Sequence, residues 1–143
     1  MQLVLETTAG MGSVLGRSFE QLAAIIDRLE DQQDVGVCFD TCHAYAAGYD
    51  VKTKKGYEGV FDHFDEVLGI GRLKAMHLND SKGALGSHLD RHEHIGKGLI
   101  GLEGFRNFMN DRRWDGIPLV LETPEGEKRY KQDLKALRSL IKK

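Results

Sequence analysis

Histidines and carboxylates are concentrated in one glycine-rich stretch, HLNDSKGALGSHLDRHEHIGKG (77–98), which holds four of the six histidines of the chain. Within it, Asp90 and His92 form a D-x-H pair, and His43 follows Asp40 by three residues in the separate motif FDTCH. Two imidazoles and a carboxylate can hold a metal ion and leave a coordination position open for water or substrate. Asp90, His92 and His43 are therefore candidate metal ligands.

A second group of candidate ligands lies near the ends of four strand-like segments. These short apolar segments are residues 3–8, 35–41, 73–80 and 118–124. Near its carboxyl end, each segment has a residue of a type that can bind a metal ion. These residues are Glu6, Asp40, His77 and Glu122. Because alternate residues of a strand share a face, all four fall on the face that otherwise carries the smaller side chains. The bulkier residues of the opposite parity, such as Phe39 and Met76, are expected to pack beneath helices.

The four predicted strands alternate with amphipathic helices. Apolar residues recur at helical spacing in residues 17–31, 57–69, 102–111 and 130–143. In the first of these segments, Ser18 and Gln21 also have capping-box spacing. Four successive βα units predict an α/β fold with a parallel sheet, in which functional residues meet at the carboxyl ends of the strands. Helix capping would explain one or two of the acidic residues, but not four ligands of one parity.

The bulk composition fits one globular domain. The chain has 143 residues, 41% of them hydrophobic, and a formal net charge of −2. This charge gives no general attraction to nucleic acid, so a polyanionic ligand would need local or metal-borne positive charge. The two cysteines, Cys38 and Cys42, are expected to be buried structural thiols of a reducing compartment. No apolar run is long enough to cross a bilayer, and we expect a cytoplasmic protein with no membrane partner.

Other polar residues of the sequence have weaker claims to a functional role. His88 and His94 are expected to be exposed loop histidines, and His63 to be solvated on its helix. Asp80 and Lys82 could support the metal site or contact phosphate, or simply form hydrogen bonds within the loop. Imidazole and carboxylate ligands suit Zn²⁺, and Mn²⁺ or iron also fit them. Several such ions close together suit the hydrolysis of phosphate esters.

The motifs ETTAGMGSVLG, GVCFDTCHAYAAGYD, MHLNDSKGALGSHLDRHEHIGKGLIG and LVLETP closely resemble those of the endonuclease IV family. This resemblance covers essentially the whole chain. It implies a TIM barrel with three zinc ions that cleaves DNA on the 5′ side of abasic sites. It also implies that Glu6 is catalytic and bridges the first and second metals. Asp40, His77 and Glu122 would complete the second metal, and the third would be held by His43, Asp90 and His92.

The chain also departs from this family, because members are about twice as long. A (β/α)8 barrel needs about 250 residues, so residues 1–143 are predicted to be a single C-terminal half-barrel domain with strands five to eight. Two histidines that complete the first metal in the family would belong to the other half, as would the loops inserted into DNA at the lesion. No DNA-binding residues are identified here. The two sheet edges of a half barrel predict self-association or pairing with an N-terminal half.

Two other functions remain open from the sequence. A sugar isomerase or epimerase of similar barrel type uses a Glu-Asp-His-Glu site with one metal, and needs no equivalent of His43, Asp90 and His92. A metal-binding half barrel that folds without cleaving DNA is the third hypothesis. Zinc-dependent incision of abasic DNA is the leading one.

Overall fold

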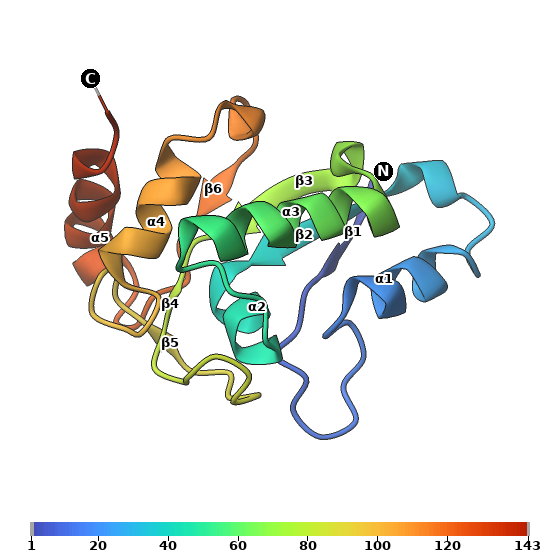
Figure 1. Ribbon diagram of the computed structural model, residues 1–143, viewed down its shortest axis with the longest axis horizontal. Helices are drawn as coiled ribbons and strands as arrows, with labels where there is room; N and C mark the ends of the chain where they lie inside the picture. The colour runs from blue at the N-terminus through green and yellow to red at the C-terminus, as the bar shows by residue number, and fades with distance from the viewer. Residues whose placement is uncertain (1, 143) are drawn as a thin grey trace.

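A four-stranded parallel sheet forms the centre of the computed structural model, which describes residues 2–142 (Figure 1). Its strands are β1 (Leu3–Glu6), β2 (Val35–Asp40), β3 (Leu73–His77) and β6 (Leu119–Val120). They lie side by side in the order β1-β2-β3-β6, so neighbours in the sheet follow one another along the chain. All three pairings are parallel. Such an arrangement needs a crossover on one side of the sheet between successive strands, as in barrels of βα units.

Helices supply these crossovers. The α-helices are α1 (Phe19–Ile26), α2 (Thr41–Ala47), α3 (Lys54–Leu68), α4 (Gly101–Met109) and α5 (Glu127–Ser139). Short 3-10 turns are η1 (Gln32–Asp34), η2 (Ile70–Arg72) and η3 (Arg112–Trp114), and a small antiparallel pair is formed by β4 (Asp80–Ser81) and β5 (His92–Glu93). In Figure 1, α1 lies toward the β1 edge, α3 crosses the middle of the sheet, and α4 and α5 lie toward the β6 edge. The predicted α/β half-barrel arrangement is confirmed.

The hydrophobic core lies between the central strands and the helices. Phe39 and Met76, from the parity expected to pack beneath helices, are fully buried. The Phe39 ring lies 5.1 Å from that of Phe61 on α3, centroid to centroid, and 6.3 Å from that of Phe108 on α4. Aromatic rings at this separation bury large apolar areas and fix the helices against the sheet. The core therefore holds the strands that carry the candidate ligands in a fixed register.

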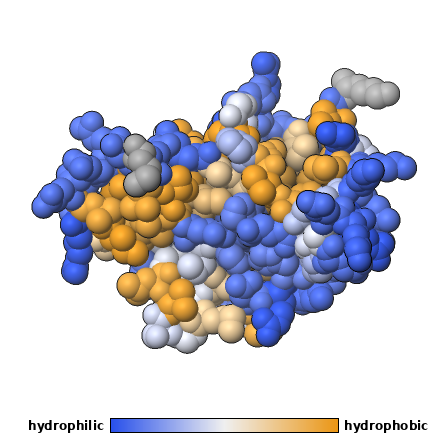
Figure 2. Space-filling view, turned by 180° about the vertical axis from the view of Figure 1, so that it is seen from behind, coloured by the Kyte–Doolittle hydropathy of each residue, from blue (hydrophilic) through white to orange (hydrophobic). Residues whose placement is uncertain are grey.

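The two edge strands are much more exposed than the central ones. Leu3 and Val4 on β1 are 52% and 40% exposed, and Leu119 and Val120 on β6 are 37% and 44% exposed. Figure 2 shows apolar surface in several separate areas, with hydrophilic surface between them. Each edge strand has a single neighbour within the described residues. A sheet with two open, apolar edges is what four of the eight strands of a barrel would present.

Several predicted elements differ from the observed ones at their ends. The predicted helix 17–31 is α1 followed by turns, and the predicted strand 118–124 pairs with β3 at only two residues. Ser18 does cap α1, accepting from the backbone N–H of Gln21 at 3.3 Å, but the Gln21 side chain turns to Gly16 and Arg17. The helix α2 was not expected. It is a single short helix with five buried residues, and so has no amphipathic period.

Among residues 2–142, no helix is long and apolar enough to cross a membrane. The predicted domain begins at Met1, and both the domain and its last predicted helix end at Lys143. These two residues lie outside the described residues.

Candidate metal centre

The four ligands predicted at the strand ends come together at the carboxyl edge of the sheet. Ligand atoms of Glu6, Asp40, His77 and Glu122 all lie within 4.8 Å of one another. His77 is at the centre, since its Nδ1 lies 3.1 Å from Glu6 Oε1 and 3.1 Å from Glu122 Oε2. Asp40 Oδ2 is 3.7 Å from the same nitrogen. One imidazole and three carboxylates thus surround a common point, and we call them the strand-end set.

Strand register places three of these residues, while Glu122 is placed differently. Asp40 and His77 are direct partners in the β2–β3 ladder, and Glu6 pairs with Cys38 on the next strand. Glu122 lies beyond the last paired residue of β6, Val120. Its backbone N–H donates to Asn79 Oδ1 at 2.8 Å. A hydrogen bond to the Asn79 side chain, and not the β-ladder, therefore fixes the position of Glu122.

A second cluster, which we call the loop set, lies directly beside the strand-end set. It consists of His43 on α2, Asp90 in the loop after β4, and His92 on β5. The Nε2 atoms of the two histidines are 3.3 Å apart, and Asp90 Oδ1 lies 3.2 Å from His43 Nε2 and 3.5 Å from His92 Nε2. Asp40 also contacts this set, with Oδ2 3.8 Å from His92 Nε2. All seven residues predicted as ligands are thus brought into one region.

Backbone carbonyl groups orient both imidazoles of the loop set. His43 Nδ1 lies 2.9 Å from the carbonyl oxygen of Thr7, and His92 Nδ1 lies 3.0 Å from that of Glu122. A carbonyl oxygen can only accept a hydrogen bond, so each Nδ1 must carry the hydrogen. In the neutral rings, both Nε2 atoms are then acceptors facing the Asp90 carboxylate. Three acceptors aimed at one place fit a cation, and this is the arrangement in which proteins hold metal-binding histidines.

Two polar residues that the sequence reasoning did not single out hold Asp40 in place. Asn79 donates from Nδ2 to Asp40 Oδ2 at 2.7 Å, and Thr7 Oγ1 accepts from the Asp40 backbone N–H at 2.9 Å. Asp40 also caps α2, because its Oδ1 accepts from the His43 backbone N–H at 2.9 Å. Both supporting residues lie in the quoted motifs, next to or near ligands, but their residue types alone gave no sign of this role.

The pKa values of the ligands show how strongly the cluster favours positive charge. Burial alone would raise the pKa of Glu6, but hydrogen bonds and charge from His43 and His77 lower it to about 2. Burial would likewise lower the pKa of His43, but Glu6, Asp40 and Asp90 raise it to about 9. Hydrogen bonding to Cys38 and Glu6 raises the pKa of His77 to about 11. Burial raises the pKa of Asp40.

Without a metal, protons on His43 and His77 therefore supply the positive charge that the carboxylates attract. A bound metal would replace these protons, because only the neutral imidazole is a ligand.

Several other predicted positions behave differently from expectation. The expectation of exposed loop histidines was wrong for His88 and His94. Both are partly buried, and their Nδ1 atoms lie 2.9 Å from the Ala9 carbonyl oxygen and from Asp133 Oδ2 respectively. His63 is likewise only partly exposed, at 39% of its side chain, and its Nε2 lies 2.7 Å from a carboxylate oxygen of Glu20.

Asp80 forms hydrogen bonds within the loop, which is one of the roles that the sequence left open for it. Its buried carboxylate accepts backbone N–H groups of five residues, Ser81, Gly96, Gly98, Ile100 and Gly101. Lys82 Nζ lies 3.8 Å from Glu93. Cys38 and Cys42 are free and buried, as predicted.

Comparison with known proteins gives the same assignment as the motifs. A family model described as xylose isomerase-like TIM barrel matches residues 1–140. An apurinic-apyrimidinic endonuclease of Caenorhabditis elegans is 53% identical over 141 residues, which is 99% of this chain and 35% of that protein. A probable endonuclease 4 of Chlorobium limicola is 56% identical over 124 residues, 87% of this chain and 43% of that protein.

A solved structure agrees with these sequence matches. The crystal structure of endonuclease IV from Thermus thermophilus superposes with a TM-score of 0.83 at 41% identity, covering 96% of this chain and 49% of that one. The chain therefore spans about half the length, or less, of the relatives it matches.

Proposed function

Because this chain belongs to the xylose isomerase-like TIM barrel family, we propose that it supplies the C-terminal half of a zinc-dependent abasic-site endonuclease. The reaction would be hydrolysis of the DNA phosphodiester on the 5′ side of an abasic site. Relatives named as endonuclease 4 and as an apurinic-apyrimidinic endonuclease support this assignment. So does the similarity to the endonuclease IV structure.

The proposal rests on one observation, which is that the loop set lies directly beside the strand-end set. His43, Asp90 and His92 bring their ligand atoms within 3.5 Å of one another, and Asp40 belongs to candidate groups on both sides. Two cation sites this close together suit hydrolysis of a phosphate diester. A sugar isomerase or epimerase with one metal would need the strand-end set alone, so the loop set argues against that alternative.

The residues have separate roles in this proposal. Asp40, His77 and Glu122 would hold one zinc ion, and His43, Asp90 and His92 another. Glu6 would belong to the first of these two sets and would also contribute to the remaining zinc ion. Bound zinc would supply Lewis acidity and offset the negative charge of the phosphate in the transition state. In the metal-free chain Glu6 has a pKa of about 2 and is ionised at neutral pH. As a carboxylate it can accept a hydrogen bond that orients the attacking water.

The length of the chain shapes what we expect of it alone. It spans half or less of its relatives, so the remaining ligands of the first metal and the DNA-binding loops would come from an N-terminal half. We propose a homodimer of half barrels for the isolated chain, in which the exposed β1 and β6 edges pair between copies. Light scattering tests this, since a stable monomer that unfolds cooperatively would contradict it.

The free, buried thiols of Cys38 and Cys42 support action in a reducing compartment such as the cytoplasm.

The test is elemental analysis of the purified chain beside incision of an oligonucleotide with one abasic site. We expect two metals to bind more readily than three, and weak or absent incision. Addition of the N-terminal half of the barrel, the complementary half, should restore incision. The Glu122→Gln variant of this chain should abolish that incision. Robust incision by the isolated chain, lost in Glu122→Gln, would mean that the half assembles a complete site by itself. Two metals without incision, even with the complementary half, would favour a metal-binding half barrel that does not cleave.

A further inference from the structure

Asp133 is a buried carboxylate on α5, outside the seven candidate ligands, with hydrogen bonds to two different segments of the site. It is 3% exposed. Its Oδ2 accepts from the Thr123 hydroxyl at 2.7 Å and lies 2.9 Å from His94 Nδ1, while Oδ1 accepts from the backbone N–H of Ile95 at 3.0 Å. A buried carboxylate is costly unless its oxygens are hydrogen bonded, and these three donors meet that need.

The partners of Asp133 are neighbours of metal ligands. Thr123 directly follows Glu122 of the strand-end set, and His94 is two residues after His92 of the loop set. The two ligand segments also touch each other, because His92 Nδ1 donates to the Glu122 carbonyl oxygen at 3.0 Å. Asp133 therefore closes a ring of contacts that includes one ligand from each set.

This ring lies where the sheet gives least support. β6 pairs with β3 only through Leu119 and Val120, so Glu122 is already past the ladder. The β4–β5 pair that carries His92 is only two residues long on each side. Ligands on such short elements need other contacts to hold their geometry, since a metal site loses affinity when its ligands are misplaced.

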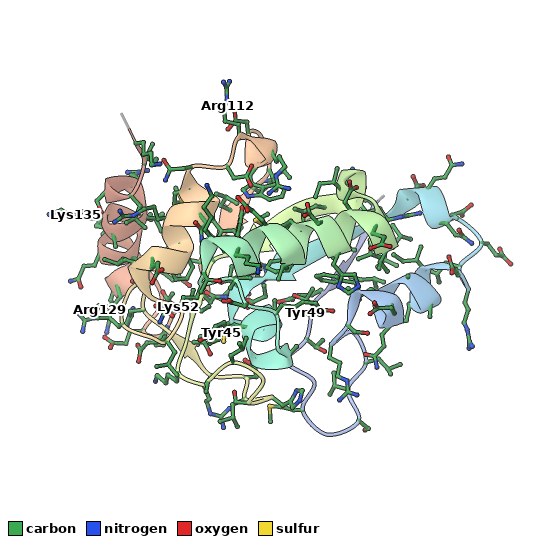
Figure 3. The ribbon with its side chains drawn as sticks, in the orientation of Figure 1. Tyr45, Tyr49, Lys52, Arg112, Arg129 and Lys135 are labelled. Carbon is green, nitrogen blue, oxygen red and sulfur yellow. The ribbon has the colours of Figure 1, made fainter. Side chains whose placement is uncertain are left out.

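α5 also has an outer face with basic side chains, in addition to the inner face that holds the buried residues Asp133 and Leu137. Arg129 and Lys135 point outward from the helix in Figure 3, whereas Asp133 is buried. Removal of the Asp133 carboxylate would thus act on the interior of the site and leave the basic outer face of α5 unchanged.

We propose that Asp133 is a positioning residue that sets the spacing between the two metal sets by tying Glu122, through Thr123, to His92, through His94. This inference rests on the proposed function only in taking the two sets as metal sites. It predicts that loss of either tie weakens one set, and that loss of the carboxylate weakens both. A buried carboxylate that only stabilised the fold would change the melting temperature without changing metal affinity.

The experiment is a titration of the metal-free chain with Co²⁺, followed by the visible absorption of the bound ion. Asp133→Asn, Thr123→Val and His94→Leu are compared with Glu127→Gln, an exposed carboxylate on the same helix. We expect Asp133→Asn to weaken both binding steps by about 10- to 100-fold and to alter the absorption bands, as for other residues that orient metal ligands. Thr123→Val and His94→Leu should each weaken one step, and Glu127→Gln neither.

Circular dichroism of each metal-free variant separates misfolding from loss of positioning. Unchanged affinities and spectra in a folded Asp133→Asn variant would overturn the proposal. If that variant does not fold, Thr123→Val decides, because it replaces a hydroxyl with a methyl group of similar size, and unchanged Co²⁺ binding in it would overturn the proposal equally. Incision of abasic DNA is measured separately with the complementary half present. If the wild-type chain and the complementary half together do not incise abasic DNA, the proposed function is contradicted. The Co²⁺ titration still tests the role of Asp133 in that case.

Discussion

The Nε2 atoms of His43 and His92 lie 3.3 Å apart, although the two residues come from α2 and β5. Each ring gives its Nδ1 hydrogen to a backbone carbonyl group, of Thr7 or of Glu122. In their neutral forms, the rings thus turn two acceptor atoms toward each other and toward Asp90. Such an arrangement is repulsive unless a proton or a metal ion lies between the acceptors. The loop set therefore indicates a cation site more clearly than the strand-end set does.

Loss of one ligand from the loop set should remove one metal and spare the other. We expect His92→Asn to lower the metal content by about one ion per chain after dialysis, because the remaining His43 and Asp90 make an incomplete zinc site. Inductively coupled plasma analysis of the dialysed protein measures this. His63→Asn is the control, since His63 is a surface residue paired with Glu20. Equal metal content in all three proteins would count against a metal in the loop set.

Glu122→Gln should affect the strand-end set with little effect on folding. The Glu122 side chain is 48% exposed and contributes a carboxylate oxygen 3.1 Å from His77 Nδ1. The amide keeps the shape of the side chain but has no negative charge, so we expect weaker metal binding at this set and an unchanged melting temperature for the metal-free chain. Isothermal titration with Zn²⁺ measures the affinity. Glu127→Gln, five residues along and also exposed, is the matched control.

Asn79→Ala should destabilise the metal-free chain. The Asn79 side chain is fully buried and bridges Asp40 Oδ2 and the Glu122 backbone N–H. Its removal leaves both groups without this partner. We expect a cost of about 1–3 kcal/mol for the buried Asp40 oxygen, and a smaller one for the part-buried Glu122 N–H. Urea unfolding followed by circular dichroism gives the change in the free energy of unfolding. The exposed Gln33→Ala should stay within about 0.5 kcal/mol of wild type, and an equally small change in Asn79→Ala would show that water replaces the amide without penalty.

The stability of the metal-free chain should fall as the pH rises from neutral. The folded-state pKa of His43 is raised from 6.5 to about 9. Protonated His43 therefore contributes stability that is fully present below pH 6.5 and is lost as the pH rises through about 9. We expect a lower melting temperature at pH 9.5 than at pH 6.5 in the presence of a chelator, and a smaller difference in His43→Asn. A melting temperature that rises over this range would contradict the ion-pair arrangement.

The affinity of the chain for zinc should change in the opposite direction and increase with pH. Metal binding displaces the histidine protons, so zinc affinity increases as the pH rises toward the pKa of the ligands. Zinc titrations at pH 6.5 and pH 8, monitored by proton release in two buffers of different ionisation enthalpy, measure this. Binding that releases no protons would show that His43 and His77 are already neutral in the metal-free chain.

The sequence by itself determined the parallel order of βα units and the identities of the seven candidate ligands. Strand periodicity puts Glu6, Asp40 and His77 on one face, and in a parallel sheet residues at the carboxyl ends of neighbouring strands must lie close together. That inference needs only local patterns and one topological rule. The same local patterns were weaker at element ends, and they missed α2 because a short buried helix has no polar face.

Only the tertiary structure decided how the ligands are held. The orientation of His43 and His92 depends on carbonyl groups that are 36 and 30 residues away in the chain. Asp133 meets His94 across 39 residues. Such contacts leave no periodic or spacing pattern in the sequence, because they arise when separate loops and helix ends pack at the same edge of the sheet. Residue type can nominate a metal ligand, but the geometry that makes it one is a property of the folded chain.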